Sequence, residues 1–517
     1  MSSVPPRLPN PALSRRGLFA AAALTAAAPA VAMALPASAA SAHGAGEPGR
    51  LVDKGLAEPV NRAFGYLDTV QDAYVTGATP RLLQSYNNES GLMTTAFVYD
   101  NALAVIAYLS RPTAANVARA KLIGDAFLWI QGNDEAHSDG RVRQAYAAGP
   151  MLFYGWWPYF PGLVREDGKA AFLWPFGFSG SAVGDVAWVA LSLTHLYAHT
   201  RQRKYLDGAV AASEWIVNTA VSPYAYGGYH GGVQGDGVTP QRWCSTEHNI
   251  DVYGLFTLLA RYTKDRAWAR RADVAGDFVR RMFNKRGGYY WTGTLGSNPA
   301  DDPNLINTAI LPEDVNTWAY LSLGDRAHAG AIDWTARSLA VTDTPAAPNS
   351  QLPAGVTVSG VTFSDMAKTL TGPVPNGTGN NNQSAVWLEG NGHMAAALLA
   401  RDAHGDRRRA VEYLRQVVVA QTSLGGGQTV GLTSDPADGR LSNPGDGGTW
   451  TGTPLPAGGA WCRPAARSTP ASGSGTSSAS TSARRAGSSS PPRGRTRTAS
   501  EDPRRPGWSP ARPARAC

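Results

Sequence analysis

Cysteine is scarce in this chain of 517 residues. It has three, and Cys244 is the only one that precedes residue 462. A framework of disulfides is therefore excluded as the means of holding the fold. Cys244 lies three positions before Glu247. Of the two interpretations, a reactive nucleophile and a small packed thiol, the packed thiol is favoured.

Patterns typical of cofactor sites are also missing. The nine histidines are scattered, without the spacing of a metal site. No glycine-rich phosphate-binding pattern stands between a predicted strand and a helix. We therefore expect no metal and no nucleotide cofactor.

The main body of the chain has no basic stripe. The whole chain carries a formal charge of +8, yet residues 462–517 alone carry +9 and residues 1–42 carry +3. The remainder is mildly acidic, so we expect no nucleic-acid partner.

The first 42 residues have the features of an export signal. The segment Ser14-Arg-Arg-Gly-Leu-Phe19 precedes an alanine-rich apolar stretch and the small-residue site Ala37-Ser-Ala39. This is the pattern of a twin-arginine signal peptide, which predicts a secreted protein. The apolar stretch is too short for a retained anchor, so we expect no membrane association after its removal.

Apolar residues recur at helical spacing through residues 43–461, and no Pro/Ser-rich linker divides this part before about residue 450. We predict one all-α domain of helical hairpins. The eleven predicted segments are 56–77, 94–110, 113–132, 184–200, 203–220, 248–263, 265–284, 313–323, 326–340, 384–404 and 407–422. Alternate members, beginning with 94–110, are apolar nearly all round, as the inner helices of a ring must be.

Carboxylates stand at the front edge of these apolar segments. Acids there can cap free N–H groups, which is the ordinary alternative. Closed into a ring, however, the hairpins would gather the acids around one polar mouth. They are Asp100, Asp185, Glu247 with Asp251, Glu313 with Asp314, and Glu389.

Three motifs carry a resemblance to a known superfamily. They are YDNA at Tyr99–Ala102, WCSTEHN at Trp243–Asn249 and WLEG at Trp387–Gly390. Over about residues 55–460 the chain resembles the secreted bacterial six-hairpin glycosidases. The resemblance implies an (α/α)6 toroid with a cleft where loops lead into the inner helices. This architecture hosts hydrolases, lyases, phosphorylases and epimerases, so it implies the fold more strongly than the substrate.

Residues 462–517 differ from the rest of the chain. They are rich in Ser, Pro, Arg and Ala and show no apolar periodicity. One interpretation is a disordered basic tail. We favour a second, in which a GC-rich coding sequence is read out of frame, because shifting the register over 480–493 gives an apolar helix. A six-hairpin ring needs a twelfth, inner helix, and on this hypothesis the chain lacks it.

Aromatic residues cluster in the loops, as in sites that bind sugar rings. Residues 151–160 and 172–178 hold many rings without a helical period, and a packed apolar lid is the alternative. The residues predicted to bind substrate are Tyr99, Trp156, Trp157, Trp188, Trp243, His248, Asn249, Asp251, Asp314, Asn316 and Trp387. A structural hydrogen bond is the alternative for Asp251, and helix capping for Asp314 and Asn316.

Glycosidic cleavage needs one protonated and one ionised carboxyl group. Glu247, beside Trp243, is the first choice for the acid, because desolvation by an aromatic ring favours the protonated form. The base is one of Asp185, Asp100 and Glu389. We predict a monomeric, secreted glycoside hydrolase whose partner is a poly- or oligosaccharide.

Two other classes stay open. A lyase or sugar epimerase would transfer protons through His248, His230, His393 or Tyr99. A non-catalytic glycan-binding protein would keep the aromatic residues and tolerate the loss of Glu247.

Overall fold

The computed structural model describes residues 51–74, 80–86, 94–149, 151–153, 156–173, 178–347, 350, 352–369, 384–424, 429–430 and 453–455, without the side chains of 151–160, 429, 453 and 454. The signal segment and the Ser/Pro/Arg-rich tail lie outside these ranges. The twin-arginine signal and the frameshift therefore stay predictions.

Every predicted helical segment contains a helix. These helices are α2 (Ala57–Asp72), α3 (Val98–Ser110), α4 (Ala114–Asn133), α5 (Val183–Thr200), α6 (Arg203–Ala220), α7 (Thr246–Thr263), α8 (Arg266–Arg281), α9 (Asp314–Leu323), α10 (Gly330–Ser338), α12 (Leu388–Arg401) and α13 (Asp406–Ser423). The short helices η2 (Lys54–Leu56), η4 (Arg326–His328) and α11 (Asp365–Thr369) complete the described set.

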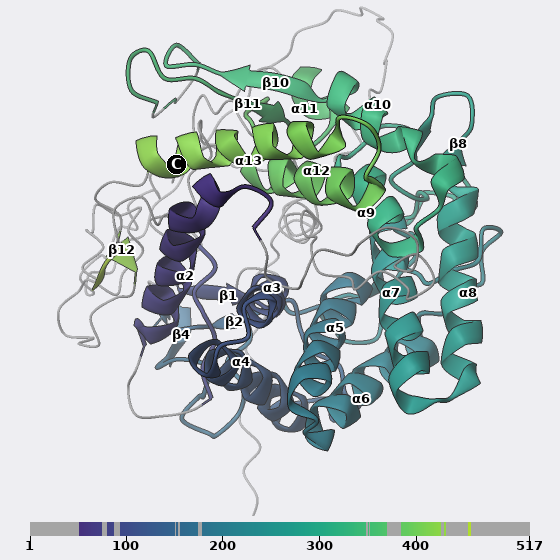
Figure 1. Ribbon diagram of the computed structural model, residues 1–517. Helices are drawn as coiled ribbons and strands as arrows, with labels where there is room; N and C mark the ends of the chain where they lie inside the picture. Colours follow the sequence, from purple (N-terminus) through teal and green to yellow (C-terminus); the bar gives the residue numbers. More distant parts are fainter. Residues whose placement is uncertain are drawn as a thin grey trace, which may run out of the picture.

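The helices form two concentric rings (Figure 1). On the inner ring, α3, α5, α7, α9 and α12 pack in succession, each against the next. Each inner helix also packs against the outer helix that follows it in the chain, from α3 with α4 to α12 with α13. The predicted all-α toroid of hairpins is confirmed.

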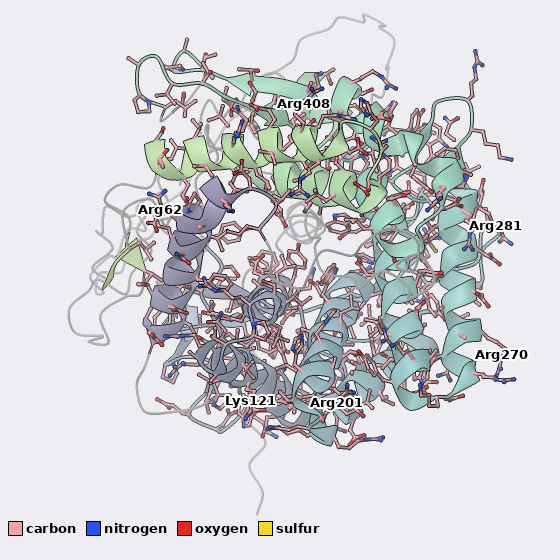
Figure 2. All side chains as sticks on the ribbon, in the orientation of Figure 1. Arg62, Lys121, Arg201, Arg270, Arg281 and Arg408 are labelled. Carbon is pink, nitrogen blue, oxygen red and sulfur yellow. The ribbon has the colours of Figure 1, made fainter. Side chains whose placement is uncertain are left out.

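Side-chain polarity explains which helix is inner. In α5, residues 183–194 are all buried, because neighbours cover every face of the helix. The outer helix α8 buries one stripe, which includes Trp268, Phe278 and Val279, and exposes arginines on the opposite face. Figure 2 shows Arg270 and Arg281 pointing away from the ring, while Arg62 and Arg408 lie on the outer helices α2 and α13.

The outer ring closes between its first and last helices. The side-chain amide of Gln421 on α13 donates a hydrogen bond to the carbonyl of Pro59 on α2 (3.1 Å). On the inner ring, no helix of the described ranges lies between α12 and α3. This is the position that the sequence assigned to a twelfth helix, and the segment proposed for it is outside the described residues.

Short antiparallel hairpins lead into the inner helices. β1 (Thr95–Phe97) runs directly into α3 and β5 (Ser181–Ala182) into α5. The sheets of β1 and β5 therefore lie at the end of the ring that holds the first turns of α3 and α5. The two-stranded sheets are β1 with β2 (Ala145–Ala147), β3 (Met151–Phe153) with β4 (Trp156–Phe160), β8 (Phe283–Asn284) with β9 (Tyr289–Tyr290), β10 (Ala340–Asp343) with β11 (Val358–Val361), and β12 (Thr429–Val430) with β13 (Thr453–Pro454); β5, β6 (Gly232–Val233) and β7 (Pro240–Gln241) form one of three strands.

None of the helices in the described ranges combines the length and apolar character that a bilayer crossing needs.

Candidate active site

The first turns of the inner helices bring the predicted carboxyl groups together at one mouth. Glu247 is the centre of this group. Burial raises the pKa of Glu247 well above its usual value, and the charges of Asp314, Asp251, Asp185 and Glu389 raise it further. Residues on α5, α7, α9 and α12 thus all act on one carboxyl group, as a ring of converging helices requires.

Glu247 itself is poorly hydrated. Its exposed fraction is 7%, and it lies in the first turn of α7, just after the N-cap Ser245. Desolvation and like charges both disfavour its ionised form. Glu247 is therefore in the state that a proton donor needs.

Glu389 occupies a contrasting environment. Its side chain is 35% exposed, the most open among the carboxylates that face His393. The Tyr99 hydroxyl donates a hydrogen bond to its Oε1 (3.0 Å), and His393 Nε2 lies 3.7 Å from the same oxygen. Glu389 therefore lies within reach of both a hydroxyl donor and a histidine side chain.

A buried ion pair stands behind Glu389. His393 Nδ1 lies 2.8 Å from Glu313 Oε2, and these side chains are 1% and 0% exposed. Burial alone would lower the pKa of His393, but the charges of Glu313 and Glu389 outweigh it and raise the pKa to about 9. The imidazole is therefore a cation at neutral pH.

The other two candidate bases are less suited to that role. Burial raises the pKa of Asp185 to about 8, although a hydrogen bond with Gln144 acts to lower it. Burial raises the pKa of Asp100 to about 7, although a hydrogen bond with Ser85 acts to lower it. Both groups hold a proton for much of the time near neutral pH.

A second layer of side chains lies one helical turn after the mouth carboxylates on the inner helices. Trp188, on α5, makes edge contacts with the rings of Tyr99 (5.8 Å between centroids) and Trp318 (6.1 Å), and Trp318 contacts His393 (5.1 Å). Asp251 is fully buried at this level, and neither of its oxygens accepts a hydrogen bond of good geometry from a described residue. Burial raises its pKa, so a protonated carboxyl is expected there.

His248 and Trp243 form one wall. Their rings lie 5.2 Å apart, and Trp243 is half-buried. Burial lowers the pKa of His248 to about 3, so its imidazole is neutral. A Cβ on Gly184 would lie 2.5 Å from the His248 ring, so glycine is what allows α5 to approach this wall. On the α12 side, Trp387 is also half-buried, with its ring 4.9 Å from that of His393.

The two predicted binding asparagines are occupied by backbone groups. Asn249 Nδ2 donates to the carbonyls of Tyr229 and Ser245, and its Oδ1 accepts from the Tyr229 N–H. Asn316 donates to the carbonyl of Pro312 and accepts from the N–H of Tyr290. Both side chains are fully buried. They hold the helix to the preceding hairpin, and we leave them out of the substrate contacts.

Asp314 is the first residue of α9, after the N-cap Glu313, whose side chain makes no cap hydrogen bond. Asp314 Oδ1 accepts a hydrogen bond from the N–H of Val315 (2.6 Å). Burial and the charge of Glu313 raise its pKa to about 7. Asp314 therefore stabilises α9 and also adds to the repulsion at Glu247.

The side chains of Trp156 and Trp157 lie outside the described residues, so their contact with substrate stays a prediction. Cys244 is buried, its thiol contacts Ser222 Oγ (3.3 Å), and burial raises its pKa to about 11. It is a packed thiol. Within the described ranges, no group of three or more His, Cys, Asp or Glu side chains is arranged to hold a metal ion.

The sequence placed Glu313 among the carboxylates of the mouth without a specific role, did not point to Trp318, and offered His393 only as a proton-transfer group. A signal was present in the spacing. Trp318 and His393 each lie four residues after a mouth carboxylate, Asp314 and Glu389, on the same helix face. Asp251 has the same relation to Glu247.

No family model and no curated protein matches the chain. Solved structures do match. One is a family 76 glycoside hydrolase (mannosidase) from Bacteroides thetaiotaomicron, with 12% identity and a TM-score of 0.46 over 78% of this chain and 96% of that chain. Another is the cellobiose 2-epimerase from Bacillus thermoamylovorans, with 11% identity and a TM-score of 0.48 over 78% of this chain and 97% of that chain.

A third match is an inactive variant of an α-1,6-mannanase of Salegentibacter sp. in complex with α-1,6-mannotetrose. It has 11% identity and a TM-score of 0.42 over 69% of this chain and 86% of that chain. Identities this low do not indicate a function, so the function of this chain has to be argued from its own side chains.

Proposed function

We propose that the protein is a glycoside hydrolase acting on a poly- or oligosaccharide, with Glu247 as the acid and Glu389 as the base or nucleophile. The observation that carries the proposal is the contrast between these two carboxyl groups. Glu247 is desolvated among like charges, whereas Glu389 is half-exposed beside a donor and a cation. Two carboxyls with opposite environments are the arrangement that glycosidic cleavage uses.

In the proposed reaction, Glu247 gives its proton to the leaving glycosidic oxygen. Glu389 activates a water molecule or attacks the anomeric carbon, and its carboxylate also stabilises the positive charge that develops on the sugar. The half-buried rings of Trp243 and Trp387 are the proposed contacts for the flat C–H faces of a sugar.

A sugar epimerase is the second candidate, and one observation favours it. His248 is neutral, and its buried Nδ1 has no hydrogen-bond partner in the described structure. Its free ring nitrogen could accept a proton from the carbon next to a carbonyl group, but a pKa of about 3 makes it a weak base for that step. A lyase is less favoured, because a uronate substrate needs cations, and His393 is the cation among the groups that act on the mouth carboxyls.

The decisive experiment is a polysaccharide screen read out by new reducing ends, followed by Glu247→Gln and Glu389→Gln. Each substitution should lower kcat roughly 100- to 10,000-fold with the melting temperature nearly unchanged. Glu58→Gln, at an exposed position of α2, is the matched control. Near-normal turnover in both variants would reject the assignment.

The products separate the candidates. Hydrolysis creates reducing ends, lyase action creates unsaturated uronides that absorb in the ultraviolet, and epimerisation changes neither chain length nor reducing-end count. Binding without any product would identify a glycan-binding protein.

We also propose export through the twin-arginine route, on the residues of the signal segment. Replacing Arg15 and Arg16 by Lys should keep the protein in the cell, as judged by fractionation.

A further inference from the structure

The Glu313–His393 pair lies outside direct reach of solvent, yet it borders the mouth. Glu313 is the N-cap residue of α9, and His393 stands in the second turn of α12. The 2.8 Å contact between His393 Nδ1 and Glu313 Oε2 joins two neighbouring inner helices. A buried charge needs such a partner, because an unpaired one would be strongly destabilising.

The second ring nitrogen of His393 is directed to Glu389. Nε2 lies 3.7 Å from Glu389 Oε1, which is longer than a hydrogen bond, and it has no other partner in the described structure. The rings of Trp318 and Trp387, at 5.1 and 4.9 Å, pack against the imidazole and fix its plane. The cation is therefore held in one orientation.

We propose that Glu313 and His393 are positioning residues, which hold Glu389 as an ionised carboxylate facing the mouth. The inference rests on the proposed function and extends it. Glu313 keeps the His393 imidazole protonated and fixes its orientation. The imidazolium attracts Glu389 Oε1, and the Tyr99 hydroxyl, on α3, donates a hydrogen bond to that oxygen. The chain Glu313–His393–Glu389–Tyr99 thus spans three inner helices.

The charged groups around His393 determine how its substitution changes the electrostatic environment of Glu389. The charged and titratable groups around the pair are Glu313 and Asp314 at the start of α9, Glu389 on α12, Tyr99 on α3 and Tyr413 on α13. His393 is the one cation in this set. Removing it leaves the Glu389 carboxyl group without a neighbouring cation.

The test is the pair of variants His393→Gln and Glu313→Gln, with His404→Gln and Glu58→Gln as exposed controls. We expect kcat to fall roughly 10- to 150-fold, as for a lost hydrogen bond or contact to a charged group, with KM nearly unchanged. The acid limb of the kcat/KM profile should move to higher pH. A lower melting temperature with an unchanged pH profile would show a merely structural role and overturn the proposal.

A measurement independent of activity guards against variants that fail to fold. In the wild-type full chain labelled with ¹⁵N-histidine, the resonance that His393→Gln removes should report an imidazolium up to about pH 9. Titration of that resonance below pH 7 would also overturn the proposal. Should Glu389→Gln retain full activity while His393 remains a cation, the proposed function fails and the ion pair stands.

Discussion

At the scale of single residues, identical side chains acquire different chemistry from their neighbours. Glu247 and Glu389 both stand in the first turn of an inner helix. One is surrounded by carboxyl groups, and the other by a hydroxyl donor and a cation. A difference in environment of this kind separates proton donor from base without a change of residue type.

Gly184 offers a residue-scale prediction. A Cβ at this position would lie 2.5 Å from the His248 ring, so Gly184→Ala must displace the ring. We expect a loss of about 1–3 kcal/mol in the free energy of unfolding, measured by chemical denaturation. Gly392→Ala is the matched control, since nothing lies within 4 Å of a Cβ there and alanine is the better helix former. Equal effects at the two positions would contradict the predicted steric conflict.

At the scale of elements, buried asparagines join inner helices to the hairpins before them. The same role appears four times, at Asn101, Asn249, Asn316 and Asn391, each of which also donates to the carbonyl four residues earlier or to the preceding hairpin. The peptide groups of a hairpin that enters a helix need such partners, because both are shielded from water. The mouth is therefore built on a rigid support.

Asn249→Ala tests this role against substrate binding. The change leaves the N–H of Tyr229 and two carbonyls without their partner. We expect a loss of about 1–3 kcal/mol in stability, with a change in KM of less than roughly twofold. Asn61→Ala, at an exposed site on α2, should be nearly neutral. A large rise in KM with unchanged stability would instead show that Asn249 binds the substrate.

At the scale of the whole molecule, the ring concentrates acids inside and basic side chains outside. The labelled cations of Figure 2 lie at its periphery, including Lys121 on α4 and Arg201 at the end of α5. Repulsion inside such a mouth opposes folding wherever the acids are ionised. Stability should therefore depend on pH in a definite direction.

The raised pKa values of the carboxyl groups at the mouth act in one direction, opposite to that of His248 and His195, whose lowered pKa values add stability as pH rises toward 6.5. Asp185, Asp100 and Asp314 have folded pKa values of about 8, 7 and 7, all above the usual 3.8, so their protonation stabilises the folded state at low pH. This contribution is lost as pH rises from about 4 to 8. His393, raised to about 9, acts in the same sense above its usual 6.5.

We expect the melting temperature to fall between pH 5 and pH 8.5, measured by calorimetry. Asp185→Asn should flatten the slope, whereas Asp273→Asn, exposed on α8, should leave it unchanged. A melting temperature that rises over this range would show that surface ion pairs dominate the pH dependence.

The hypothesis that the twelfth, inner helix is missing gives a second whole-molecule prediction, which the described residues do not test. A ring without it leaves the apolar faces of α12 and α3 uncovered. Several Leu-sized side chains at about 1.5–3 kcal/mol each compare with a net stability of roughly 5–15 kcal/mol. A version with the tail frame restored should melt at a higher temperature and stay soluble. Stop codons in the alternative frame of the nucleotide sequence would end this hypothesis.

The sequence by itself determined the helices and their order. Apolar periodicity located each segment to within a few residues, since burial of one stripe or of all faces leaves a direct mark on residue type. Alternation between all-round apolar and one-sided helices also distinguished the inner from the outer ring. The gathering of acids at one mouth followed from their place at the start of each inner helix.

Only the tertiary structure decided the roles of these residues. The Glu313–His393 contact joins positions 80 residues apart, and the Tyr99–Glu389 bond joins positions 290 apart, so no local pattern encodes either. Protonation states depend on burial and on charges from other helices. Asn249 was predicted to bind sugar, but its side chain binds the backbone of Tyr229 instead. Tyr229 lies 20 residues earlier in the chain, so no local pattern shows this contact either. Local pattern sets which elements form, and packing between distant elements sets what their side chains do.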